Sequence, residues 1–278
     1  MSAIPLINAA RTNPALATAL AAVPEWQRTV DVREAVQAKI ISAPRTPSPP
    51  TPTSGDQLDE WLDAAITAND QKALADRRHA ALTSLAGELT HTLDGILFVV
   101  GDRMLANLHD QLTTVMTAVA TIAEKLDGAD NANAAITQQV ERHWRALPEL
   151  RARYDSIRAA QGAISSSVDP DMHRNAISPH TPDELASDLM LANVDELVPG
   201  WRIADTRWVA SGYPERRTPW PTEPIEQLVW LATSDAQPWV PTTEQLEQLA
   251  EKRRNRPPMN VKPIVVHGRI DRKVTTNA

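Results

Sequence analysis

Apolar residues recur every three or four positions between residues 82 and 126. The members of this stripe are Leu82, Leu85, Leu89, Leu93, Ile96, Val100, Met104, Leu108, Leu112, Val115, Val119, Ile122 and Leu126. Their mean spacing is about 3.7 residues, which is the period of one face of an α-helix. This period favours straight or slightly right-handed packing over a left-handed coiled coil. A stripe of this length must be buried, which predicts a helical bundle that packs on itself or on further copies of the chain.

The helix that carries the stripe is expected to begin at a capping box, Ser54–Gln57, and to run to about Asp127. Its first apolar face consists of Leu58, Trp61, Leu62, Ala65, Ile66, Ala73 and Leu74. One unbroken helix over this span would be about 105 Å long. Gly87, Gly95 and Gly101 each lower the stability of such a helix by about 1 kcal/mol relative to alanine. We therefore expect a break at Gly101–Asp102 or near Asn69–Asp70.

Five consecutive apolar residues lie between Gly95 and Gly101. They are Ile96, Leu97, Phe98, Val99 and Val100. A helical segment that is apolar on every side must be enclosed, so the block is predicted to be the centre of a core or of an oligomer interface. A buried strand is the alternative for so short a run, but the surrounding helical period favours a helix.

A second helix is expected after a turn at Asp127–Asn133. Its apolar positions are Ile136, Val140, Trp144, Leu147, Tyr154 and Ile157, and Pro148 is expected to kink it. Two helices joined by a short turn form an antiparallel hairpin. Residues 56–165 are therefore predicted to be a long helical hairpin or bundle.

Residues 1–43 are expected to form a helical arm, with helix starts at Asn13–Pro14 and at Asp31–Glu34. The stretch Ser42–Gly55 is rich in proline, and we assign residues 44–55 of it to a separate segment. Its prolines exclude a helix or a central strand. Two interpretations stay open for this extended segment. It is either a linker between domains or a strap that lies along a neighbouring subunit.

The composition changes again after residue 165. Residues 166–258 hold five of the eight tryptophans and are expected to form a small domain with helix starts at Thr181, Thr222 and Thr242. Trp201–Val209 is either a short strand or an irregular loop. The tail, residues 259–278, contains the best β candidate, Ile264, Val265 and Val266. Tryptophans such as Trp201, Trp208 and Trp230 are expected to fill a core, to anchor an interface or to line a pocket.

Composition excludes several classes of chemistry. The chain of 278 residues has no cysteine, so disulfides, thiolate catalysis and cysteine-based zinc sites are excluded. A formal net charge of −7 argues against a general nucleic-acid binder. We expect no transmembrane helix, because no apolar run reaches 18 residues, and no secretory signal, because the first residues lack a basic region.

Candidate reactive groups do not assemble into a motif. Glu88 and His91 have the spacing of a di-iron ligand pair, but the second helix offers only Glu141 and His143, at a different spacing. No phosphate-binding glycine loop, zinc-protease motif or calcium-binding loop is present. The basic run at residues 252–256 fits a helix C-terminus, or a contact with an acidic partner. We therefore predict no catalytic residue, no metal site and no cofactor.

These patterns predict a mainly α protein: a long hairpin or bundle, an N-terminal helical arm, and a smaller C-terminal domain rich in proline and tryptophan. We expect a non-enzymatic structural protein that forms a homo-oligomer and binds other structural proteins of an assembly, without a membrane. Its predicted interface residues are Ile96, Leu97, Phe98, Val99, Val100, Trp201, Trp208, Trp230, Ile264, Val265 and Val266.

The strap-like segment and the helical hairpin give the chain a family resemblance. In style it resembles virion-associated structural proteins of tailed phages that infect GC-rich hosts, such as minor capsid, connector or tail-accessory proteins. The resemblance implies a subunit that coats or joins a particle, in the virion or in the cytoplasm of the producing cell.

Two alternatives belong to other classes. One is a secreted or host-interaction helical hairpin like type VII secretion substrates, although the chain has no Trp-x-Gly turn and carries Arg158 where that family's signal after Tyr154 has an acid. The other is a ligand-binding protein or an enzyme that uses the tryptophan-rich domain, which requires a pocket with convergent polar groups near Trp201, Trp208 or Trp230.

Overall fold

The computed structural model describes residues 3–43, 48–129, 132–168, 188–197, 207–208, 214–215, 220–221 and 223–254. The helices in these ranges are α1 (Ala3–Ala10), α2 (Pro14–Ala21), α3 (Pro24–Ile41), the 3-10 turn η1 (Gly55–Gln57), α4 (Leu58–Ala123), α5 (Ala132–Thr137), α6 (Glu141–Trp144), α7 (Leu147–Val168), α10 (Val194–Leu197), α11 (Pro224–Thr233) and α12 (Thr243–Arg254). Two short strands, β1 (Arg207–Trp208) and β2 (Pro214–Glu215), pair antiparallel. The expected mainly α fold is confirmed.

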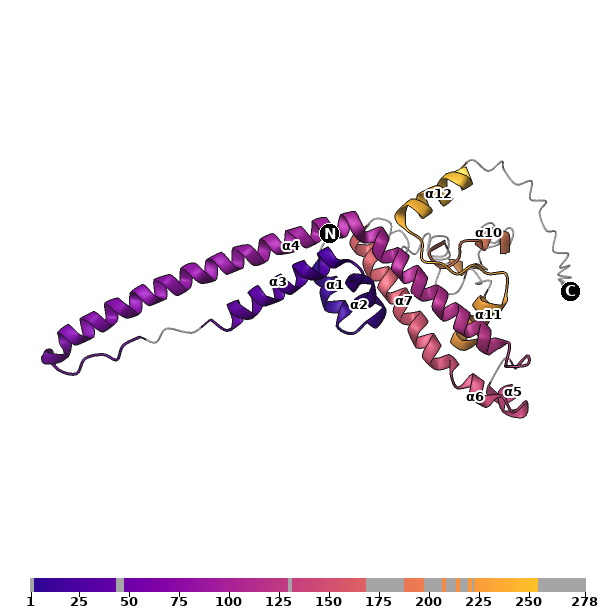
Figure 1. The fold of residues 1–278 in the computed structure, drawn as a ribbon, viewed down its shortest axis with the longest axis horizontal. Coiled ribbons are helices and arrows are strands. Elements are labelled where there is room, and N and C mark those ends of the chain that lie inside the picture. Colours follow the sequence, from indigo (N-terminus) through magenta and orange to yellow (C-terminus); the bar gives the residue numbers. More distant parts are fainter. Residues whose placement is uncertain are drawn as a thin grey trace, which may run out of the picture.

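Helix α4 runs the length of the molecule, and the other elements are arranged along it (Figure 1). It is one continuous helix of 66 residues, or about 100 Å. The expected break, at Gly101–Asp102 or near Asn69–Asp70, was wrong, and so was the alternative that residues 96–100 form a strand. In Figure 1 the helix bends near its middle without interruption.

The core lies between the second half of α4 and the helices that cover it. On α4 the buried side chains of the predicted stripe are Leu93, Val100, Met104, Leu108, Leu112, Val115 and Val119. They meet the buried face of α7, which consists of Leu147, Leu150, Tyr154, Ile157, Ala160, Gln161 and Ile164. Helix α11 packs against both α4 and α7. The long stripe is therefore buried within one chain from residue 93 onwards.

Helices α1 and α2 belong to this bundle, because both contact α4 and α7 and their side chains Leu6 and Leu16 are buried. The helix start at Asn13–Pro14 is confirmed: Asn13 Oδ1 accepts a hydrogen bond from the Leu16 N–H. A start at Asp31–Glu34 was wrong, since α3 already begins at Pro24, where proline fits the first turn.

Helix α3 lies antiparallel to α4, and two polar contacts fix the register. Arg33 Nε donates to Thr90 Oγ1 at 3.0 Å, and Arg103 forms an ion pair with Glu25 at 3.0 Å. The pKa of Glu25 is lowered, first by hydrogen bonds from backbone N–H groups at the start of α3 and then by Arg103. Both contacts are close to solvent, so they set alignment more than stability.

The second helix of the hairpin is divided. The turn at Asp127 and Gly128 has positive φ angles, as its composition predicted, and Gln139 (φ 62°) separates α5 from α6. Pro148 was expected to kink this helix. Instead it lies at the second position of α7, where its missing N–H breaks no hydrogen bond. Ile136, placed on the apolar face by the sequence, is exposed.

The ends of the proline-rich segment are described on both sides of residues 44–47. Residues 48–54 run beside the beginning of α4 (Figure 1), and Pro49 and Pro52 are half-buried. The capping box at Ser54–Gln57 differs from the prediction, because Gln57 Oε1 accepts from the N–H and the hydroxyl of Thr53. Ser54 instead donates to the Asp56 carboxylate and thereby lowers its pKa.

The C-terminal elements begin near two of the predicted starts. Helix α11 is capped by Glu223, whose carboxylate accepts from the N–H groups of Ile225 and Glu226. Helix α12 has the predicted capping box, since Thr242 and Gln245 bond reciprocally. Thr181, Thr222 and the tail with Ile264, Val265 and Val266 lie outside the described residues.

Leu108→Ala tests the buried stripe. Leu108 has no exposed surface, so we expect its truncation to lower the free energy of unfolding by about 2–5 kcal/mol, as measured by urea titration. Ile41→Ala is the control, because Ile41 is 82% exposed and its truncation should change stability by less than about 0.5 kcal/mol. Equal losses in the two variants would contradict the assignment of the core.

Two glycines of α4 test how closely α7 approaches it. A Cβ at position 95 meets no atom within 4 Å, whereas a Cβ at position 101 lies 2.5 Å from a methyl group of Val168. Gly95→Ala should therefore raise the free energy of unfolding by about 0.5–1 kcal/mol through helix propensity alone. Gly101→Ala should lower it, because Val168 must move. If Gly101→Ala stabilises the protein as much as Gly95→Ala, the close contact is absent.

Candidate functional site

The predicted interface block on α4 is divided between the core and the surface. Leu97 and Val100 are buried, and Ile96 packs partly against the core. Phe98 is 66% exposed and Val99 is 77% exposed. The expectation that the chain's own core encloses the block was therefore wrong for two of its five residues. A helix that crosses a bundle on one side presents its other side to solvent, whatever its local composition.

The other predicted interface residues lie in the C-terminal part. Trp230, on α11, is half-buried and packs against the core. Trp208 lies in β1, whose backbone pairs with β2. Trp201, Ile264, Val265 and Val266 lie outside the described residues. The structure thus brings Trp230 to the α4–α7 bundle, and among the predicted residues whose side chains are described it leaves Phe98 and Val99 exposed on α4.

The structure also exposes a second apolar surface on α4, which the predicted interface residues did not include. Residues 58–85 of α4, which we call the distal arm, contain no buried side chain, and the first buried residue of the helix is Ala86. Five large apolar side chains of the arm are exposed: Leu58, Leu62, Ile66, Leu74 and Leu85. The sequence indicated their apolar face through its helical spacing. It contained no signal that this face lies beyond the reach of the bundle.

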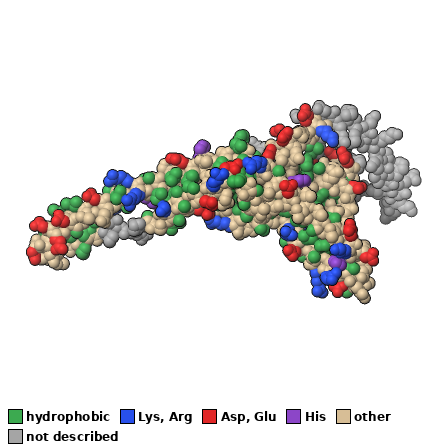
Figure 2. All heavy atoms as spheres, viewed as in Figure 1, with side chains coloured by type: hydrophobic (Ala, Val, Ile, Leu, Met, Phe, Trp, Pro, Cys, Tyr) green, Lys and Arg blue, Asp and Glu red, His purple; other side chains and the backbone are tan. Residues whose placement is uncertain are grey.

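Exposed apolar side chains are concentrated on this one helix. Ten large ones are exposed in the described part of the chain, and seven of them lie on α4 between Leu58 and Val99. Figure 2 shows apolar side chains along the narrow end of the molecule, interspersed with charged ones. A concentration of exposed apolar side chains on one element is typical of sites that bind another protein.

An arginine on α7 holds the C-terminal segment on the bundle. Arg158 Nη1 donates to the carbonyl oxygens of Trp239 (2.7 Å) and Leu189 (3.2 Å), and its Nη2 donates to that of Met190 (3.2 Å). The guanidinium lies 5.0 Å from the ring centroid of Tyr154. We call this set of contacts the Arg158 clamp. Sequence reasoning missed it, because an arginine in a helix pattern is normally assigned to the surface.

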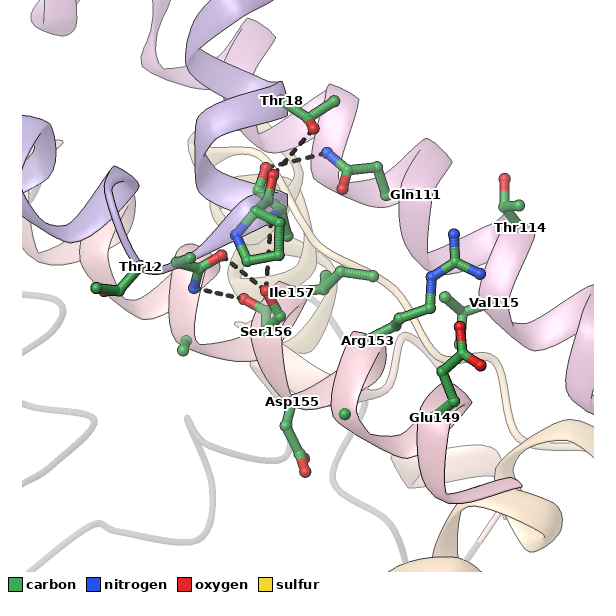
Figure 3. Close-up of a pocket in the computed structure, with 15 residues that line it drawn as sticks. Thr12, Thr18, Gln111, Thr114, Val115, Glu149, Arg153, Asp155, Ser156 and Ile157 are labelled. Atoms are coloured by element: carbon green, nitrogen blue, oxygen red, sulfur yellow. Dashed lines mark hydrogen bonds between the residues drawn. The ribbon is translucent and has the colours of Figure 1, made fainter. Parts of the chain in front are cut away.

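A groove with a volume of about 690 Å³ lies between α2, α4 and α7. Four of its polar side chains, Asn13, Thr18, Gln111 and Ser156, are bonded to other residues that line it (Figure 3). Asn13 donates to the Ser156 carbonyl and accepts from its hydroxyl, and Gln111 donates to the Ala15 carbonyl. These bonds join α2 to its two neighbours. The groove is therefore a packing junction.

Titratable groups do not converge elsewhere in the described ranges. Glu88 and His91, the pair with di-iron spacing, are both exposed on α4. Within those ranges no three histidine, aspartate or glutamate side chains are placed to share a metal ion. No described helix combines the length and the hydrophobicity needed to cross a bilayer.

Arg158→Ala tests the clamp. The substitution removes the three hydrogen bonds to the C-terminal carbonyls and a fourth to Gln161 Oε1, so we expect the free energy of unfolding to fall by at least about 2 kcal/mol. Limited proteolysis should also cut faster within residues 188–240. Arg153→Ala, an exposed position on the same helix, is the control and should leave both measurements unchanged. Equal behaviour of the two variants would show that the clamp does not hold the segment.

Comparison with family models, with curated proteins and with solved structures finds no match for this chain. Its function is therefore argued from its own geometry. Three features carry that argument: the exposed apolar side chains of α4, the Arg158 clamp and the bonded groove at Asn13. Of these, the α4 surface is the one whose large apolar side chains stay exposed in the described part of the chain.

Proposed function

We propose that this chain is a non-enzymatic structural subunit that assembles by helix-mediated self-association. The observation that carries the proposal is the series of exposed apolar side chains on α4, from Leu58 to Val99. Leaving them in water costs about 25 cal/mol for each Å² of apolar surface that a partner could cover. A helix of about 100 Å also gives a subunit the reach to contact neighbours far from its own core.

The chain's chemistry is consistent with a role in assembly. In the described residues, polar groups that converge, such as Asn13 with Ser156 or Arg158 with three backbone carbonyls, bond to one another and join segments of the bundle, while Arg158 Nε is buried without a hydrogen-bond partner. On the resemblance to tailed-phage structural proteins, we propose that the assembly is a virion. The partners would then be copies of the chain and other structural proteins of the particle.

Light scattering after size exclusion tests self-association. The intact chain, run over a concentration series, should give a mass that is a multiple of one chain. Leu62→Ser with Phe98→Ser should shift this equilibrium toward the monomer, because two exposed apolar side chains are lost from the α4 surface. Ile136→Ser, at an equally exposed apolar residue on α5, should leave the mass unchanged.

Two results would contradict the proposal. A single-chain mass at every concentration would show that the chain does not self-associate. An oligomer that loses mass equally in the Ile136→Ser control would show that α4 is not the surface responsible.

A further inference from the structure

The distal arm has two distinct faces. Its half-buried residues are Trp61, Ala65, Ala68, Ala75 and Leu82, which recur at steps of four, three and seven and so share one face. A second face, which we call the outer ridge, is exposed and consists of Leu58, Leu62, Ile66, Asn69, Ala73 and Ala80. At 3.6 residues per turn the two faces point about 120° apart. Partial burial is therefore confined to the first face, and the outer ridge stays open to solvent.

Charge is distributed unevenly along the arm. Residues 56–70, which include its tip, carry Asp56, Asp59, Glu60, Asp63 and Asp70 and no basic residue. Further along, Lys72, Arg77 and Arg78 accompany one acid, Asp76. Figure 2 shows acidic side chains gathered at the narrow tip and basic ones farther along. The arm is thus acidic at one end and basic at the other.

We propose that the outer ridge binds the outer ridge of a second copy of this chain, antiparallel, about a two-fold axis at the level of Ala68. The inference rests on the proposed function, because it names the partner and the geometry of self-association. A parallel pair would place acidic tip against acidic tip. An antiparallel pair places each tip beside the basic half of the other arm, which favours association.

The pairing is complementary in shape as well as in charge. With the axis at residue 68, Leu62 of each copy lies level with residue 74 of the other, about 1.5 Å along the helix from Ala73, the nearest residue of the other outer ridge, so a large side chain faces a small one. Asp59 and Arg77 are 18 residues apart, which is five helical turns, so both lie on the same flank of the ridge. About this axis, Asp59 of each copy meets Arg77 of the other. In the described structure neither the Asp59 carboxylate nor the Arg77 guanidinium forms an ion pair within the chain.

The absence of cysteine makes the geometry directly testable. Asn69 and Ala80 are both exposed on the outer ridge, and either can carry a single cysteine in the full-length chain. Near the axis, the two copies of Asn69→Cys lie about 3 Å apart along the helices. The two copies of Ala80→Cys lie about 36 Å apart. Mild oxidation should therefore cross-link most of the Asn69→Cys protein and little of the Ala80→Cys protein.

The outcomes separate this inference from the proposed function. Cross-linking at both positions would indicate a parallel pair, and cross-linking at neither would place the ridge outside the interface; each overturns the proposal. The mass of the same samples by light scattering then shows whether self-association itself persists. If it does, only the antiparallel ridge is wrong. If it does not, the proposed function has failed as well.

A charge exchange provides an independent test. Asp59→Arg and Arg77→Asp should each raise the dissociation constant about tenfold, since each puts two repulsive contacts into the symmetric pair. The double variant Asp59→Arg/Arg77→Asp should return it to within about twofold of the original value. Circular dichroism checks that the single variants keep their helix. Additive weakening in the double variant would overturn the contact.

Discussion

Burial of the apolar stripe of α4 is the constraint on which the rest of the structure depends. The helix is about 100 Å long, whereas α7 spans about 33 Å and α3 about 27 Å. Helix α7 lies against the second half of α4, and α3 lies antiparallel to its middle. Most of the distal arm extends past both. The described helices leave this part of α4 without a packed neighbour on every side, so part of its apolar surface stays in contact with solvent.

Local interactions then determine how the shorter elements dock on α4. Asp94 accepts a hydrogen bond from the Ala3 N–H at 2.7 Å, and Asp102 accepts one from the Thr243 N–H at 2.9 Å. Asn13 caps α2 and also bonds Ser156 on α7. In each case one polar side chain satisfies a backbone group at or near the start of a helix while joining segments that are far apart in sequence. The Arg158 clamp does the same for carbonyl groups of the C-terminal segment.

The exposed surface of α4 and the proposed assembly follow from the same length mismatch. Within the bundle, apolar residues on α4 have partners on α3, α7 and α11. On the distal arm, half-buried residues lie on one face only, and large apolar residues such as Leu62 and Ile66 lie outside it. In the proposed pair, a second copy would supply the missing partner with the chemistry the arm already has, namely large and small apolar residues and opposite charges at its two ends. Self-pairing of this kind would complete a packing that the described residues begin.

The sequence by itself determined the helical class, the face of α4 that becomes the core, the start of α2 at Asn13–Pro14 and the capping box at Thr242–Gln245. These depend on short-range periodicity and on hydrogen bonds between residues close in the chain. Tertiary structure decided the rest. It kept α4 unbroken at Gly101, where α7 approaches closely, and it assigned Leu97 to the core while leaving Phe98 exposed. It also turned Arg158 inward. Such outcomes depend on which distant segment covers a given face, and because one helical turn presents the same side chains whatever lies beside it, the local pattern carries no information about that neighbour.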